Sequence, residues 1–146
     1  MSGIAEMVAS LAGAAGGDGA GAGGAGGVAL EVGEGGREVV VRLGPHGERT
    51  QRVFVEDRGE DYAFWSVVLG KGEVDAMEWG ELVELVWVRN AKTPLVAFMV
   101  DGRGRLVGRV DHRKRTLDAG ELGVILRVLG RECDRLEWLV TGRDRR

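Results

Sequence analysis

The chain has 146 residues, of which 44% are hydrophobic and 29% are charged, the size and composition of one globular domain with its own core. Its formal net charge is −3, and no apolar run approaches the roughly 18 residues of a transmembrane helix, so composition argues against a membrane protein and against a strongly basic nucleic-acid-binding domain. The single cysteine excludes an internal disulfide, and the first residues lack the basic region of a signal peptide, so we expect a cytoplasmic protein.

The chain begins with a short helical pattern followed by a glycine-rich tract. Ile4, Met7, Val8 and Leu11 repeat at helical spacing, which predicts an amphipathic helix within residues 1–12. Residues 13–27 are almost entirely glycine and alanine and are expected to form a flexible linker. The linker leaves two alternatives open, because the helix could dock on its own sheet or on a second copy.

Inside this tract, residues 21–26 match the G-x-G-x-x-G pattern of dinucleotide-binding loops. Such a loop needs a strand before the glycines and a helix after them, so that helix amides point at the pyrophosphate. Here a helical pattern precedes the glycines and a strand pattern follows them. We therefore expect no nucleotide site and no cofactor.

Four strands are predicted after the tract, at 28–32, 37–43, 51–57 and 62–70. The turn sequences between the later ones, "GPHGERT" and "RGED", are rich in turn formers. Successive hairpins of this kind predict an antiparallel meander.

Residues 75–90 change to a helical period. Trp79, Leu82, Val83 and Val86 fall on one stripe, which we expect to face the core, although "LVELVWV" alone would also suit a strand. Asp75 followed by Glu78 predicts a capping box, and Pro94 prevents the helix from continuing past Thr93.

The last third of the chain predicts a hairpin and a long helix. Strands at 95–100 and 105–110 flank the turn "DGRG". A second capping box, Asp118 with Glu121, begins a helix with apolar residues at steps of three and four. Two ends are compatible with the pattern, one near residue 134 and one near 140, and residues 141–146 are expected to fray.

The elements therefore follow the order α-β-β-β-β-α-β-β-α. This order predicts an α+β domain over residues 28–140, with an antiparallel sheet of about five to six strands packed by helices.

Catalytic and metal-binding patterns are not apparent. His46, His112 and Cys133 lack the spacing of a metal site, and no serine lies in a nucleophile elbow. Cys133 falls on the apolar stripe of the last helix, which indicates a buried, inert thiol. We expect no metal, no catalytic residue and no enzyme, with a small-molecule enzyme of unknown class kept as a remote alternative.

The basic segment 103–115 is the most distinctive charged feature. On a strand, Arg105, Val107 and Arg109 share one face while Leu106, Gly108 and Val110 take the other. Three interpretations are open: a solvated face, a surface for an acidic protein partner, or a surface for nucleic acid. The pI of about 5.5 argues against the last.

Two tryptophans on the predicted helix 75–90 are candidate anchors for a partner. Trp79 and Trp87 are eight residues apart, which separates them by about 80° around a helix. We expect one of them to lie at the edge of the buried stripe, where a half-exposed indole suits an interface.

The stretch "LVAFMVDGRGRLVGRVDHR" followed by "LDAGELGVILRVLGRECDRLE" resembles the second half of the YbjN-like and type III secretion chaperone-like family. This chain departs from the family in two ways: one additional strand is predicted, and the glycine tract separates the first helix from the sheet. The resemblance implies a non-enzymatic, often dimeric scaffold that binds a protein or an extended peptide.

These observations predict a chaperone-like or regulatory binding module that forms a homodimer and takes a protein or extended-peptide partner, acidic in character. The residues expected to contact partners are Trp87, Phe98, Arg105, Arg109 and Arg113. The alternative is a nucleic-acid-associated protein that uses segment 103–115.

Overall fold

The computed structural model describes residues 3–15, 29–33, 37–44 and 48–142. Most of the predicted linker, residues 16–27, and the end of the predicted tail, residues 143–146, lie outside these ranges. The helices are α1 (Ile4–Ala15), α2 (Lys71–Asp75), α3 (Trp79–Lys92) and α4 (Ala119–Thr141), with a 3-10 turn at Lys114–Thr116. The strands are β1 (Ala29–Val32), β2 (Glu38–Leu43), β3 (Arg49–Asp57), β4 (Asp61–Leu69), β5 (Ala97–Val100) and β6 (Leu106–Arg113).

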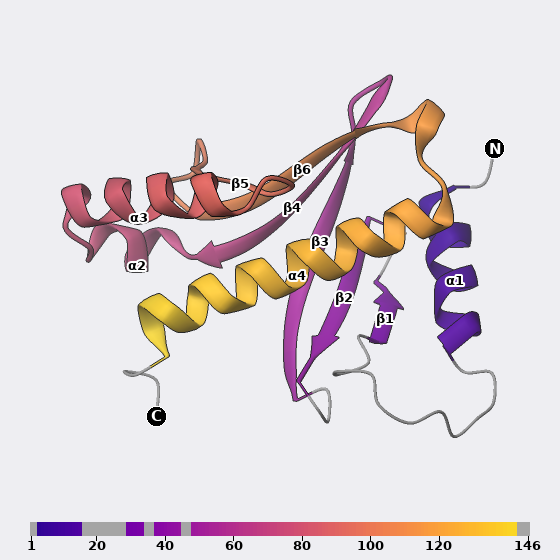
Figure 1. Ribbon diagram of the computed structural model, residues 1–146, viewed down its shortest axis with the longest axis horizontal. Coiled ribbons are helices and arrows are strands. Elements are labelled where there is room, and N and C mark those ends of the chain that lie inside the picture. Colours follow the sequence, from indigo (N-terminus) through magenta and orange to yellow (C-terminus); the bar gives the residue numbers. More distant parts are fainter. Residues whose placement is uncertain (1–2, 16–28, 34–36, 45–47, 143–146) are drawn as a thin grey trace.

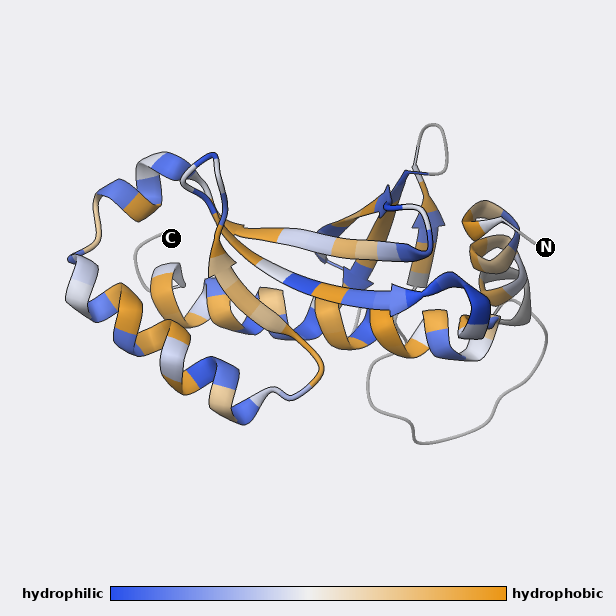
Figure 2. Cartoon of the chain, turned by 90° about the horizontal axis from the view of Figure 1, so that it is seen from above, coloured by the Kyte–Doolittle hydropathy of each residue, from blue (hydrophilic) through white to orange (hydrophobic). Residues whose placement is uncertain are grey.

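The six strands form one antiparallel sheet in the order β1-β2-β3-β4-β6-β5. The α+β class and the predicted order of elements are confirmed, with α2 as a short addition. α4 runs across one face of the sheet. α1 lies at the amino-terminal end of α4, and α2 and α3 lie beyond the carboxy-terminal half of α4 (Figure 1). The opposite face carries no helix of the described chain (Figure 2).

The core lies between α4 and the sheet. The buried side of α4 presents apolar side chains at helical spacing to the inward residues of β2, β3, β4 and β6. β6 alternates as predicted, because Leu106 and Val110 face this core while Arg109 lies on the open side. The chain enters α4 through the predicted capping box, in which Asp118 accepts a hydrogen bond from the Glu121 amide. α4 then continues without a break to Thr141, which decides between the two predicted ends.

The predicted helix 75–90 is wrong in its boundaries and its cap. Asp75 does not cap a helix; it ends α2, where its carboxylate pairs with Lys71 one turn earlier. The cap of α2 uses Glu73, whose side chain reaches back to the Gly70 amide. α3 therefore begins only after Glu78, whose side chain makes no capping bond.

Two glycines allow α4 to lie close to the sheet. A Cβ on Gly108 of β6 would lie 2.5 Å from the Cys133 sulfur, and one on Gly130 of α4 would lie 2.8 Å from Val41 Cγ1. Any side chain at these positions would push the helix away from the strands.

Cys133 is fully buried beneath this contact, as the sequence predicted. Burial raises the pKa of its thiol to about 12.

We expect thiol reagents to label Cys133 of the native protein far more slowly than Cys133 of the urea-unfolded chain at pH 8. The folded state holds the thiol proton more tightly than the unfolded chain, so this thiol's contribution to stability is constant below the ordinary thiol pKa and declines as the pH rises toward 12. Equal labelling rates for native and unfolded protein would contradict the burial.

Candidate protein-binding surfaces

The outer side of α3 is an exposed apolar face. Trp79, Val83 and Trp87 are 65%, 48% and 77% exposed, whereas Leu82 alone among the α3 residues is buried in the core. The expectation that Trp79, Val83 and Val86 face the core together with Leu82 is therefore wrong for Trp79 and Val83. The helix lies beyond α4, so only its inner edge meets the domain (Figure 1).

These side chains line a groove of about 570 Å³ between α3 and β5. The groove is apolar except for one amide side chain, and its lining residues are Trp79, Leu82, Val83, Val86, Trp87, Asn90, Ala91 and Val100. A contiguous exposed apolar face that includes two tryptophans is typical of a protein-protein interface rather than of a solvated helix. We call these residues the α3 groove.

Charge is divided along α3. The amino-terminal half carries Glu78, Glu81 and Glu84, and the carboxy-terminal half carries Arg89 and Lys92. None of the five forms an ion pair with another residue in the described ranges. At about 100° per residue, Glu78, Glu81, Arg89 and Lys92 lie on the side of α3 opposite Val83 and Trp87, so the groove itself stays apolar.

The outer edge of β5 is occupied by α3. The Asn90 side chain accepts a hydrogen bond from the Phe98 amide at 2.7 Å and donates one to the Phe98 carbonyl at 3.0 Å. The carboxamide thus takes the position of a neighbouring strand at Phe98, so this edge is partly closed to strand addition. A partner that approaches here meets the helix rather than the sheet.

A second candidate surface lies on the open face of the sheet, at the turn between β5 and β6. Asp101 Oδ1 accepts hydrogen bonds from the amides of Arg103 and Arg105, and its Oδ2 accepts two from the Arg105 guanidinium, at 2.9 and 2.7 Å. Burial raises the pKa of Asp101, but the hydrogen bonds from Arg105 and Arg103 outweigh it and lower this pKa overall. Asp101 therefore stays ionised and holds both the turn and Arg105 in place.

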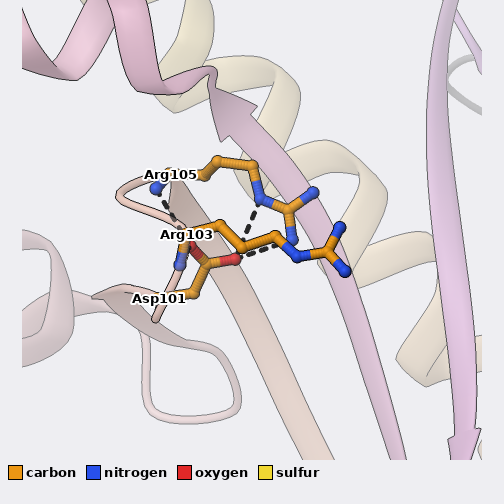
Figure 3. Close-up of polar contacts among 3 residues, drawn as sticks. All are labelled: Asp101, Arg103 and Arg105. Atoms are coloured by element: carbon orange, nitrogen blue, oxygen red, sulfur yellow. Dashed lines mark hydrogen bonds and ion pairs between the residues drawn. The ribbon is translucent and has the colours of Figure 1, made fainter.

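The Arg103 and Arg105 side chains project in the same direction from this turn (Figure 3). The Arg105 guanidinium lies 5.1 Å from the centre of the Trp65 ring, a cation-π contact. Trp65 in turn stacks on Phe54, with ring centres 4.5 Å apart. A hollow of about 300 Å³ opens above these groups and is lined by Glu56, Trp65, Met99, Asp101, Arg103, Arg105, Val107 and Arg109. We call it the arginine hollow.

The register of the sheet explains this grouping. Phe54, Trp65 and Arg109 are cross-strand partners on β3, β4 and β6, so they form one row across the open face. Arg109 also pairs with Asp111, at 2.9 Å.

The five residues predicted to contact partners are distributed over separate places. Trp87 lies in the α3 groove, and Arg105 and Arg109 lie in the arginine hollow. Arg113 is exposed four residues further along β6, about 13 Å from Arg109. The Phe98 side chain is 2% exposed and belongs to the core, so it is not available for direct contact.

Sequence reasoning missed Trp79 and Val83 as exposed residues, and missed Phe54, Trp65, Asp101 and Arg103 as parts of one hollow. A usable signal was present for α3, because apolar residues lie on too wide an arc for one buried stripe. No comparable signal was available for the hollow, which depends on strand pairing.

Other kinds of site have less support in the described chain. Within the described residues, no three His, Cys, Asp or Glu side chains gather in an arrangement that could hold a metal. No described helix is long and apolar enough to span a membrane. In segment 103–115, three of the cations already pair with carboxylates: Arg105 with Asp101, Arg109 with Asp111, and Lys114 with Asp57. Those pairs reduce the charge left for phosphates.

Comparison with known proteins identifies similar folds. No family model matches the chain, and no curated protein matches it. The fold resembles that of a chain in the heterodimeric ExoU–SpcU complex from the type III secretion system of Pseudomonas aeruginosa, with a TM-score of 0.51 and 21% identity over 67% of this chain and 79% of the other. A chain of the ExsC–ExsE complex matches 92% of this chain and 90% of its own length, with a TM-score of 0.49 and 17% identity. The first similarity is one of fold, and it agrees with the type III secretion part of the resemblance noted in the sequence, whereas neither the family models nor the curated proteins show the YbjN-like part.

Proposed function

We propose that this protein is a non-enzymatic, chaperone-like binding module that acts in the cytoplasm as a homodimer and holds a segment of a partner protein. The observation that carries the proposal is the exposed apolar face of α3, whose tryptophans are too exposed to contribute much to the stability of one chain. The similarity of the fold to a chain of a two-protein secretion complex supports a binding role.

The apolar side chains of α3 favour a second copy as the occupant of the α3 groove. If two α3 helices pack antiparallel about a two-fold axis, each position i faces position 170 − i. Val83 then faces Trp87, and Trp79 faces the small Ala91. Each indole therefore meets a smaller side chain of the other copy, as an isologous interface requires.

Light scattering with a substitution on each side of α3 tests the homodimer. We expect a mass of about twice 15.6 kDa at micromolar concentration. Val83→Arg should weaken the dimer, because it places a charge opposite Trp87 of the second copy, whereas Glu81→Arg changes the other side of the helix and should leave the dimer intact. A wild-type chain that stays monomeric, or a Val83→Arg variant that keeps the wild-type mass, would contradict this arrangement.

A further inference from the structure

The arginine hollow is a charged site that the proposed dimer does not use. It lies on the open face of the sheet, whereas the α3 groove lies between α3 and β5, and the two share no lining residue. Of its three arginines, Arg105 pairs with Asp101 and Arg109 pairs with Asp111. Asp101 already accepts four hydrogen bonds, two from amides and two from Arg105. The Arg103 guanidinium pairs with no carboxylate among the described residues.

The hollow therefore holds unused donors in a fixed position. Arg105 has five N–H donors, and Asp101 occupies two of them, which leaves three. Arg103 adds its own guanidinium beside them (Figure 3). The Asp101 turn fixes Arg105 before any ligand arrives, which lowers the entropy cost of binding. Such a pair of guanidinium groups suits one carboxylate.

The floor of the hollow is apolar. The Trp65–Phe54 stack continues into Val107 and Met99, which are on the same face of the neighbouring strands. Alternate side chains of an extended segment lie about 7 Å apart on one side. The Arg105 guanidinium is 5.1 Å from the centre of the Trp65 ring. If an acidic residue of such a segment binds Arg103 and Arg105, the side chain two residues along the segment therefore lies over the Trp65 indole.

The surrounding charges distinguish a single carboxylate from a polyanion. Glu56 lines the hollow, and the exposed Asp111 lies beside Arg109. Both carboxylates would repel the successive phosphates of a nucleic acid, whereas one carboxylate with an apolar neighbour avoids them. The volume of about 300 Å³ is also at the lower limit for small-molecule sites, and suits one or two side chains.

We propose that the arginine hollow binds an extended segment of a partner protein that carries an aspartate or glutamate two residues from an apolar side chain. Arg103 and Arg105 bind the carboxylate, Trp65 contacts the apolar side chain, and Asp101 positions Arg105. This inference rests on the proposed function, because it names the chemistry of the segment that the module holds.

Selection from a random dodecapeptide library on the full-length protein tests it. We expect enrichment of Asp or Glu two positions from Leu, Ile, Val, Met or an aromatic residue. For the best peptide, the counterpart with the acid replaced by its amide should bind about tenfold more weakly or worse. In the Arg103→Gln variant, the ratio between the affinities for the acidic peptide and its amide counterpart should fall below about threefold, because one of the two guanidinium groups that bind the carboxylate is gone. Arg103 makes only a backbone contact with Asp101, so this variant keeps the turn.

Arg131→Gln is the matched control, since it removes the same charge from the exposed side of α4, on the other side of the sheet. It should bind both peptides as the wild type does. No enrichment, enrichment without an acid, or oligo-dT binding that depends on Arg103 would overturn the proposal. Peptides whose binding requires Trp87 and not Arg103 would also overturn it, although the protein would still be a protein-binding module. A wild-type chain that is monomeric but still selects acidic peptides through Arg103 would contradict the proposed homodimer and support the arginine hollow.

Discussion

Replacing Trp87 by serine is expected to convert the proposed dimer into a monomer. The indole is 77% exposed in a single chain, so its loss should change the free energy of unfolding of that chain by no more than about 0.5 kcal/mol. In the two-fold arrangement each copy loses an anchor worth about 2 kcal/mol, and the two losses together raise the dimer Kd about 1000-fold. Sedimentation velocity across a range of concentrations measures this change.

Trp138→Ser is the matched control for this experiment. Trp138 is 51% exposed on α4 and does not line the α3 groove, so its replacement should leave the dimer Kd unchanged. If Trp87→Ser keeps the wild-type Kd, or if Trp138→Ser dissociates the dimer as fully, then the α3 groove is not the interface.

Replacing Gly108 by alanine is expected to destabilise the fold by about 3 kcal/mol. The new methyl group would lie 2.5 Å from the Cys133 sulfur, 3.1 Å from Phe98 Cε1 and 3.2 Å from Val96 Cγ1. A buried contact of 2.5 Å forces either the strand or α4 to move, and overpacking of this kind typically costs about 1–3 kcal/mol. Urea denaturation followed by circular dichroism, at one fixed protein concentration, measures the loss.

A double-mutant cycle assigns the cause to the sulfur. Cys133→Ala removes the atom in the closest contact, so the double variant should be more stable than the sum of the two single effects predicts, by about 1 kcal/mol or more. Gly72→Ala is the control, because no atom lies within 4 Å of its Cβ position and alanine is favoured over glycine in a helix. Additive effects at Gly108 and Cys133 would contradict the steric explanation.

The local elements of this protein were largely predictable because their signals are short-range. The hairpin at 95–110 follows from alternation around a D-G turn, and the Asp118–Glu121 box marks the start of α4. The cap at Asp75 was mispredicted because two residue types at the correct spacing do not decide between capping and an ion pair. Lys71 lies one turn before Asp75 and takes its carboxylate.

The candidate surfaces were predictable only in part. Arg105 and Arg109 were assigned to one face of a strand from alternation alone, and they lie in the same hollow. Their neighbours Phe54 and Trp65 are distant in sequence, and only the pairing of β3, β4 and β6 places them in one row. Phe98 was expected to offer apolar surface that a partner would bury, but its position on β5 directs its side chain into the core.

The sequence by itself determined the α+β class, the antiparallel order of elements and the inward and outward faces of β6, because alternation, helical period and capping act between residues close in the chain. Only the tertiary structure decided which apolar residues are buried. Periodicity shows that side chains share a face of a helix, but a face is buried only where another element reaches it. α4 spans the sheet and does not reach the outer side of α3, so Leu82 is buried while Trp79 and Val83, which the sequence assigned to the same core stripe, are exposed on the surface that we propose for a second copy.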